Sequence, residues 1–131
     1  MVIKSYSKIN LTLNVGFKDK RGLHKIQSYF CLIDLADRIK LKKNKTQKDS
    51  VIFIGRFAKL VKKSNNSILN LLRLLRKLRL ISNYYSVTVK KNIPVFAGLG
   101  GGTGNAAFIF KHLIKKNINK SLFSQVESKI G

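Results

Sequence analysis

Apolar and polar residues alternate along most of the first half of the chain, and this pattern predicts β-strands. Residues 3–16 predict a half-buried strand, with an apolar side formed by Ile9, Leu11, Leu13 and Val15. After a charged turn, residues 26–35 form a second extended run. Alternation returns over residues 37–42, and a polar stretch then leads into a short apolar run over residues 51–54. The first half is therefore predicted to be mainly β-structure.

Helical spacing appears in the second half. The run that begins near residue 67 predicts an amphipathic helix. Its candidate cap is Asn66 or Ser67, and its apolar stripe consists of Ile68, Leu71, Leu72, Leu75 and Leu78. We expect this helix to end near Asn83, a strand to follow over residues 85–91, and further helices over residues 103–116 and 122–130. This order of elements predicts an α+β domain.

A cluster of glycines separates the last predicted strand from the next helix. Five glycines fall within seven residues of Pro94-Val95-Phe96-Ala97-Gly98-Leu99-Gly100-Gly101-Gly102-Thr103-Gly104-Asn105-Ala106-Ala107. Glycine lets backbone N–H groups approach an anion closely, and a helix that starts there points its positive end at the same place. The segment therefore predicts a phosphate-binding loop, with a tight turn that holds no ligand as the alternative.

Two well-known phosphate motifs fit this cluster poorly. A P-loop needs Lys followed by Ser or Thr after the glycines, and the segment has neither pair. The dinucleotide pattern G-x-G-x-x-A matches residues 102–107, but the predicted strand ends several residues too early and no second strand follows.

The net positive charge of the chain makes several kinds of anionic partner possible. The chain has 131 residues, 44% of them hydrophobic, and 27 Lys and Arg against 5 Asp and Glu give it a net charge of +22. It is long enough for one domain, and its field attracts nucleic acid, anionic membranes and phosphorylated small molecules. Candidate nucleic-acid contacts are Arg73, Arg76, Lys77, Tyr84 and Tyr85. The alternative is that the cations, spread along the chain, lie on solvated surfaces.

Other features favour a cytoplasmic location. Cys31 is the only cysteine, and its apolar neighbours predict a buried position in a reducing compartment. No run reaches the roughly 18 apolar residues of a membrane span. The N-terminus has Lys4 and Lys8 with no apolar run between them, so it is not a secretory signal.

Separated segments of the chain resemble the motifs of one enzyme family. The glycine segment resembles P-x-x-x-G-L-G-G-G-S-S-N/D-A-A, and residues 7–11 (Ser-Lys-Ile-Asn-Leu) resemble A-K-I-N-L. Residues 21–24 (Arg-Gly-Leu-His) resemble D-G-Y-H, and residues 32–37 resemble the strand pair beyond it. These are motifs of the GHMP kinases, in particular of those that phosphorylate a cytidine-diphosphate-linked small molecule in the non-mevalonate isoprenoid pathway.

The resemblance implies an incomplete GHMP-kinase N-terminal domain, of the ribosomal protein S5 domain 2-like fold, over residues 1–131. ATP, with Mg²⁺, would lie over Pro94, Val95, Phe96, Ala97, Gly98, Leu99, Gly100, Gly101, Gly102, Thr103, Gly104 and Asn105. Thr103 would hydrogen-bond a phosphate or a magnesium-bound water, and no residue is expected to bind the metal directly.

The resemblance also implies roles on the substrate side. Lys8 would be catalytic, because a cation near the reacting hydroxyl stabilises the charge that builds up during transfer. Asn10 and His24 would place the substrate, with His24 reading the cytosine. The alternatives are a solvated strand lysine for Lys8 and a turn residue for His24.

Several features depart from the family pattern. Leu23 replaces a tyrosine that stacks on cytosine, Gly104 replaces the second serine of the loop, and Phe96 stands where small residues are usual. The family's catalytic aspartate lies in a G-A-D-V-P motif that would follow residue 131, and Asp34 and Asp37 are expected to be structural. We therefore expect the chain alone to lack the aspartate and the C-terminal domain and to be inactive, which leaves a non-catalytic kinase remnant or a basic nucleic-acid-binding protein as alternatives. Its oligomeric state stays open.

Overall fold

A four-stranded sheet forms the centre of the fold in the computed structural model, which describes residues 2–20, 22–62, 66–115 and 119–130. The strands are, in spatial order, β1 (Val2–Asn10), β4 (Phe30–Asn44), β6 (Tyr84–Lys90) and β5 (Ser50–Ile54). β5 runs parallel to β6, and the other neighbouring strands are antiparallel.

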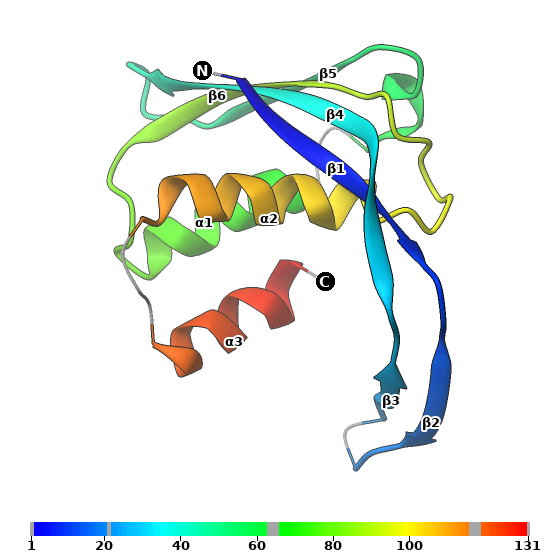
Figure 1. The fold of residues 1–131 in the computed structure, drawn as a ribbon. Coiled ribbons are helices and arrows are strands. Elements are labelled where there is room, and N and C mark those ends of the chain that lie inside the picture. Colours follow the sequence, from blue (N-terminus) through cyan, green and yellow to red (C-terminus); the bar gives the residue numbers. More distant parts are fainter. Residues whose placement is uncertain (1, 21, 63–65, 116–118, 131) are drawn as a thin grey trace.

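Three helices lie on one side of this sheet (Figure 1). α1 (Ser67–Lys77) and α2 (Gly101–Leu113) run beneath the sheet, and α3 (Lys120–Ile130) lies farther out, against α1. A short 3₁₀ turn, η1 (Ala58–Leu60), follows β5. None of the described helices is long and apolar enough to cross a membrane. The predicted α+β class is confirmed by this arrangement.

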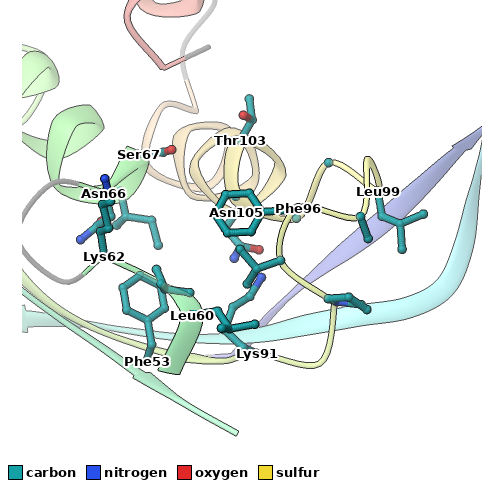
Figure 2. A pocket seen from close by; sticks show the side chains of 18 of the residues that line it. Phe53, Leu60, Lys62, Asn66, Ser67, Lys91, Phe96, Leu99, Thr103 and Asn105 are labelled. Atoms are coloured by element: carbon teal, nitrogen blue, oxygen red, sulfur yellow. The ribbon is translucent and has the colours of Figure 1, made fainter. Parts of the chain in front are cut away.

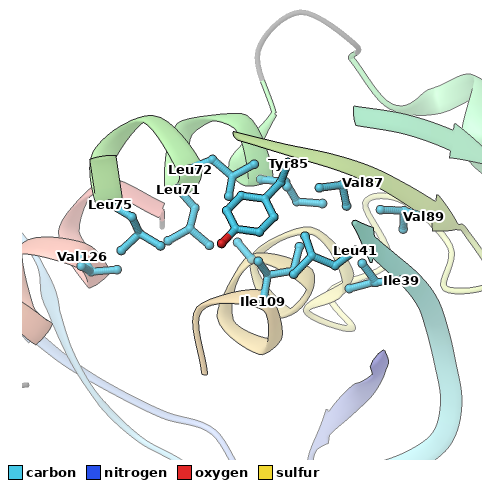
Figure 3. Close-up of a cluster of buried hydrophobic side chains, with 12 residues drawn as sticks. Ile39, Leu41, Leu71, Leu72, Leu75, Tyr85, Val87, Val89, Ile109 and Val126 are labelled. Carbon is cyan, nitrogen blue, oxygen red and sulfur yellow. The ribbon is translucent and has the colours of Figure 1, made fainter. Parts of the chain in front are cut away.

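The core lies between the sheet and the helices, as Figure 3 shows. Its buried side chains include Ile39 and Leu41 from β4, Tyr85, Val87 and Val89 from β6, Leu71, Leu72 and Leu75 from α1, Ile109 from α2 and Val126 from α3. The predicted apolar stripe of α1 is confirmed, with Leu78 half-buried at its end.

α1 begins where the sequence predicts and ends earlier. The Asn66 side chain caps it by accepting a hydrogen bond from the backbone N–H three residues later, at 3.0 Å. Arg79 adopts a left-handed conformation, with φ of 56°, and the next backbone N–H bonds back across the last turn. This is a common way to end a helix, so α1 stops at Lys77 rather than near Asn83.

The predicted single strand over residues 3–16 is wrong, because the chain leaves the sheet after Asn10. β2 (Asn14–Lys18) and β3 (His24–Gln27) form a separate two-stranded hairpin that extends away from the helices (Figure 1). The side predicted to be buried is exposed, and it consists of Ile9, Leu11, Leu13 and Val15. Ser5 and Ser7 precede Ile9 on the same side of β1 and are buried, because α2 packs against this part of the strand and their small side chains let it approach.

The extended run predicted over residues 26–35 is divided between the end of β3 and the start of β4, and β4 continues through residues 37–42 as one long strand. β4 pairs with β1 on both sides of a bulge, and the alternation predicted over residues 37–42 is confirmed. Cys31 is half-buried rather than buried, because this end of β4 runs beyond the helices toward the hairpin (Figure 1).

Candidate functional site

The glycine loop joins β6 to α2 and shapes the start of the helix. Gly98 and Gly100 have φ values of 71° and 72°, a conformation that glycine adopts readily. Gly100 caps α2, and its carbonyl accepts the first helical hydrogen bond, from the Gly104 N–H at 2.7 Å. The helix therefore starts at Gly101, two residues before the predicted start at Thr103.

The backbone N–H groups of residues 101–103 precede that first helical bond. They have no partner within the helix and point out of its N-terminus, where the helix dipole favours an anion. The arrangement can therefore hold a phosphate group by backbone contacts, without a lysine in the loop.

A cavity of about 650 Å³ lies against this loop. Figure 2 shows its lining: the glycine loop forms one side, and β5, η1 and the start of α1 form the other. The second side carries an apolar wall of Phe53, Leu60, Val61 and Ile68, and its polar residues are Lys62, Asn66, Ser67 and Asn70. Such a volume fits a nucleotide-sized ligand, with an apolar wall for a planar group and a helix N-terminus for its phosphates.

A buried carboxylate holds both ends of the loop. One oxygen of Asp37 accepts hydrogen bonds from the backbone N–H groups of Asn92 and Ile93, at 2.8 and 2.9 Å. The other accepts from the Lys91 ammonium and from the Asn105 amide, the latter at 2.8 Å. Because residues 91–93 precede the loop and Asn105 lies in α2, Asp37 joins three elements at one point.

This cluster also fixes how closely α2 approaches the end of β6. A Cβ atom on Gly101 would lie 3.0 Å from Ile93 Cγ2 and 3.2 Å from the Lys91 ammonium nitrogen. Both distances are too short for an ordinary contact, so only glycine fits here without a shift. Gly102 differs, since no atom lies within 4 Å of the corresponding position.

The structural role expected for Asp37 agrees with its burial, whereas Asp34 is exposed. Sequence reasoning did not find the partnership with Lys91, although a signal for it exists. The alternation of β6 places Tyr85, Val87 and Val89 inward, and its continuation puts Lys91 on the same buried face. A buried ammonium needs a counter-charge, and the chain has 5 acidic residues to supply one.

Lys8 and Asn10 lie on the β1 side of the loop. The Lys8 backbone N–H donates to the Leu99 carbonyl at 3.1 Å, and its side chain runs past Gly100. The Lys8 ammonium donates to Asn10 Oδ1 at 2.8 Å, and the Asn10 amide donates to Ser28 at 2.7 Å. The structure thus brings Lys8 and Asn10 together beside the loop, although neither lines the cavity.

His24 lies apart from this group. It is exposed on β3, and its Nδ1 is 2.8 Å from the Gly16 carbonyl across the hairpin. Leu23 beside it is exposed as well, and Arg21 of the same motif falls outside the described residues. The hairpin therefore carries the expected substrate-side residues on an uncovered surface.

The features that suggested nucleic-acid binding have other partners. The Arg76 guanidinium forms a two-pronged ion pair with Asp49, at 2.9 and 3.0 Å, and stacks on the Tyr84 ring at 4.0 Å. Tyr85 belongs to the hydrophobic core. These two tyrosines and Arg76 are therefore used within the fold, whereas Arg73 and Lys77 are exposed on α1.

Comparison with known proteins agrees with the expected fold. No protein-family model matches the chain. It is 43% identical, over 98% of its length, to 4-diphosphocytidyl-2-C-methyl-D-erythritol kinase of Pelagibacter ubique. It is 33% identical to the protein of the same name from Caldanaerobacter subterraneus, again over 98% of its length. The chain spans about half the length of these curated relatives, 48% and 45% respectively.

Solved structures of kinases are similar to this fold. A crystal structure of 4-(cytidine 5'-diphospho)-2C-methyl-D-erythritol kinase aligns with 100% of this chain and 46% of its own, at a TM-score of 0.69 and 25% identity. A homoserine kinase from Cytophaga hutchinsonii aligns with 98% of this chain and 40% of its own, at a TM-score of 0.63; its 15% identity shows the fold alone.

The sheet, its helices and the glycine loop therefore have the fold of the N-terminal half of the GHMP kinases. Within that family, the chain is related in sequence to the 4-diphosphocytidyl-2-C-methyl-D-erythritol kinases.

Proposed function

We propose that the chain is the ATP-binding half of a kinase that phosphorylates the free hydroxyl of 4-diphosphocytidyl-2-C-methyl-D-erythritol, a step of isoprenoid biosynthesis. The observation that carries this proposal is the cavity of about 650 Å³ between the glycine loop and the apolar wall. Its position would direct the triphosphate to the N-terminus of α2 and the base to that wall.

Mg²⁺ would bind together with the nucleotide. Among the described residues, no three His, Cys, Asp or Glu side chains lie close enough together to hold a metal ion. Magnesium prefers oxygen ligands and commonly binds through substrate phosphates and water. Thr103, exposed at the edge of the cavity, offers a hydroxyl suited to a magnesium-bound water, and the bound ion would neutralise phosphate charge.

The other side of the loop would face the phosphate acceptor. In the transfer, the acceptor oxygen bonds to the γ-phosphorus, the bond from that phosphorus to the β–γ bridging oxygen breaks, and the hydroxyl proton moves to a base. The Lys8 ammonium, held by Asn10 beside Gly100, would stabilise the charge on the transferring group. His24 would contact the cytosine from the hairpin.

Among the residues that the structure describes, none beside the loop is a candidate for the base. Asp37 is fully buried and its oxygens accept four hydrogen bonds. We therefore assign proton removal to the part of the relatives' length that this chain does not match, and expect the isolated chain to bind ATP without turnover.

ATP binding is tested by calorimetry with Mg²⁺-ATP at physiological salt. Gly102→Val adds a side chain in open space at the cavity, so it should block the phosphates while the thermal midpoint stays close to that of the parent. Arg73→Ala, which removes an exposed charge on α1, is the matched control and should bind ATP normally. A folded Gly102→Val variant with unchanged affinity would show that the loop assignment is wrong.

Phosphoryl transfer is tested by adding the unmatched half of the Pelagibacter ubique relative as a second polypeptide. Labelled product should appear only with both halves, ATP and the cytidine-linked alcohol, and Lys8→Ala should reduce the rate by about 10²-fold or more. If ATP binds but the paired halves give no product, the chain is a nucleotide-binding module without turnover. Polynucleotide binding that weakens steeply with salt and survives Gly102→Val would favour the nucleic-acid alternative.

A further inference from the structure

Phe96 in the glycine loop has an unusual backbone conformation and an unusually exposed side chain. Its backbone has a φ of 64°, in the left-handed region that glycine adopts readily and a phenylalanine does not. Its ring is 92% exposed, so the strained conformation is not offset by packing in the core. A glycine would satisfy this turn better and would remove an apolar ring from water.

The Phe96 ring is positioned to contact a ligand in the cavity. Phe96 lines the cavity, and Figure 2 shows its ring reaching from the loop toward the side that carries Phe53 and Leu60. A flat group in the cavity would therefore have an aromatic face on the loop side and an apolar wall on the other. Strained residues of this kind gather where a ligand is held.

We propose that Phe96 stacks on the base of the bound nucleoside triphosphate and closes the cavity over it. This inference rests on the proposed function and adds a residue that sets affinity for the base rather than for the phosphates. The ring carries no charge and no hydrogen-bonding group, so it distinguishes a nucleotide from a simple polyphosphate through stacking alone.

The test compares two probes, Mg²⁺-ATP and Mg²⁺-tripolyphosphate, on the parent chain and on Phe96→Gly. The variant should bind ATP roughly 5- to 150-fold more weakly, which is the range that one base–aromatic stack contributes. Its affinity for tripolyphosphate should be unchanged, and its thermal midpoint should not fall, because glycine suits the left-handed backbone. The matched control is Phe17→Gly on β2, where the ring is 96% exposed and far along the chain from the cavity.

A fluorescence measurement gives an independent answer. The chain contains no tryptophan, so Phe96→Trp introduces a single reporter. ATP should change its emission with saturation, tripolyphosphate should change it little, and Phe17→Trp should respond to neither probe.

Three results would overturn the inference, and they separate it from the proposed function. If the parent binds ATP and Phe96→Gly binds it equally well, or if both probes weaken by the same factor, the stacking role is refuted and the proposed function stands. If the parent binds neither probe, the proposed function fails and the role of Phe96 fails with it.

Discussion

Replacing Asp37 by Asn should destabilise the chain more than any other single change of one carboxylate to its amide. The Asp37 carboxylate is fully buried and its ion-pair partner, the Lys91 side chain, is only 3% exposed. The amide keeps one oxygen, which can still accept from the Asn92 and Ile93 N–H groups. Its –NH₂ group, however, would replace the oxygen that accepts from Lys91 and Asn105, and so would place donors against donors.

The size of the effect follows from the burial. Removing one partner of a buried ion pair leaves an uncompensated charge and costs about 3–5 kcal/mol. A domain of this kind has a total free energy of unfolding of roughly 5–15 kcal/mol, so the substitution would remove a large fraction of it. Asp49→Asn is the matched control: Asp49 is nearly buried, but its partner Arg76 is 22% exposed, and we expect a loss of about 1–3 kcal/mol.

The measurement is urea unfolding followed by circular dichroism, with the midpoint compared at constant slope. Lys91→Met in the Asp37→Asn background removes the unpaired ammonium and should restore most of the lost stability. The reasoning is refuted if Asp37→Asn lowers the free energy of unfolding by less than about 1 kcal/mol, or if the added Lys91→Met brings no recovery.

Three further predictions concern separate parts of the chain. Gly101→Val should lower the free energy of unfolding by about 1–3 kcal/mol, because its side chain would meet Ile93, whereas Gly102→Ala should leave the urea midpoint nearly unchanged. Asn66→Ala should cost about 1 kcal/mol by removing the cap of α1, measured by thermal unfolding, and an unchanged midpoint would contradict that role. Phe17→Asp should change stability by less than about 0.5 kcal/mol while raising solubility, since the side chain is 96% exposed; a larger loss would mean that the ring is packed in solution.

The elements with strong local signals were predictable from the sequence. Asn66 has the side chain of a helix cap, and the residues after it repeat at helical spacing, so the start and the buried face of α1 could be placed from local chemistry alone. The glycine cluster likewise predicts the turn at Gly100 and the helix that follows, because the backbone there needs a residue without a Cβ.

The features that the sequence did not predict depend on contacts between distant segments of the chain. Alternation places Ser5 and Ser7 on the same side of β1 as Ile9, but it cannot say how far along the strand the helices cover that side, and the burial ends before Ile9. The same limit hid the partnership of Asp37 with Lys91, which are 54 positions apart. The left-handed backbone of Phe96 was invisible for another reason, since a bulky residue at such a position opposes its own local preference.

The two sides of the glycine loop differ in how firmly the chain fixes them. On the cavity side, where we propose that ATP binds, Asp37 ties residues 91–93 to α2, so the loop could meet a triphosphate without rearranging. On the side where we propose that the acceptor binds, Asn10 lies at an exposed strand end and His24 lies on a hairpin that no described helix covers. ATP affinity should therefore depend on this chain alone, whereas the alignment of the acceptor should depend on whatever polypeptide covers β2 and β3. Substitutions in the hairpin would then reduce phosphoryl transfer in the reconstituted pair and leave the ATP affinity of the isolated chain unchanged.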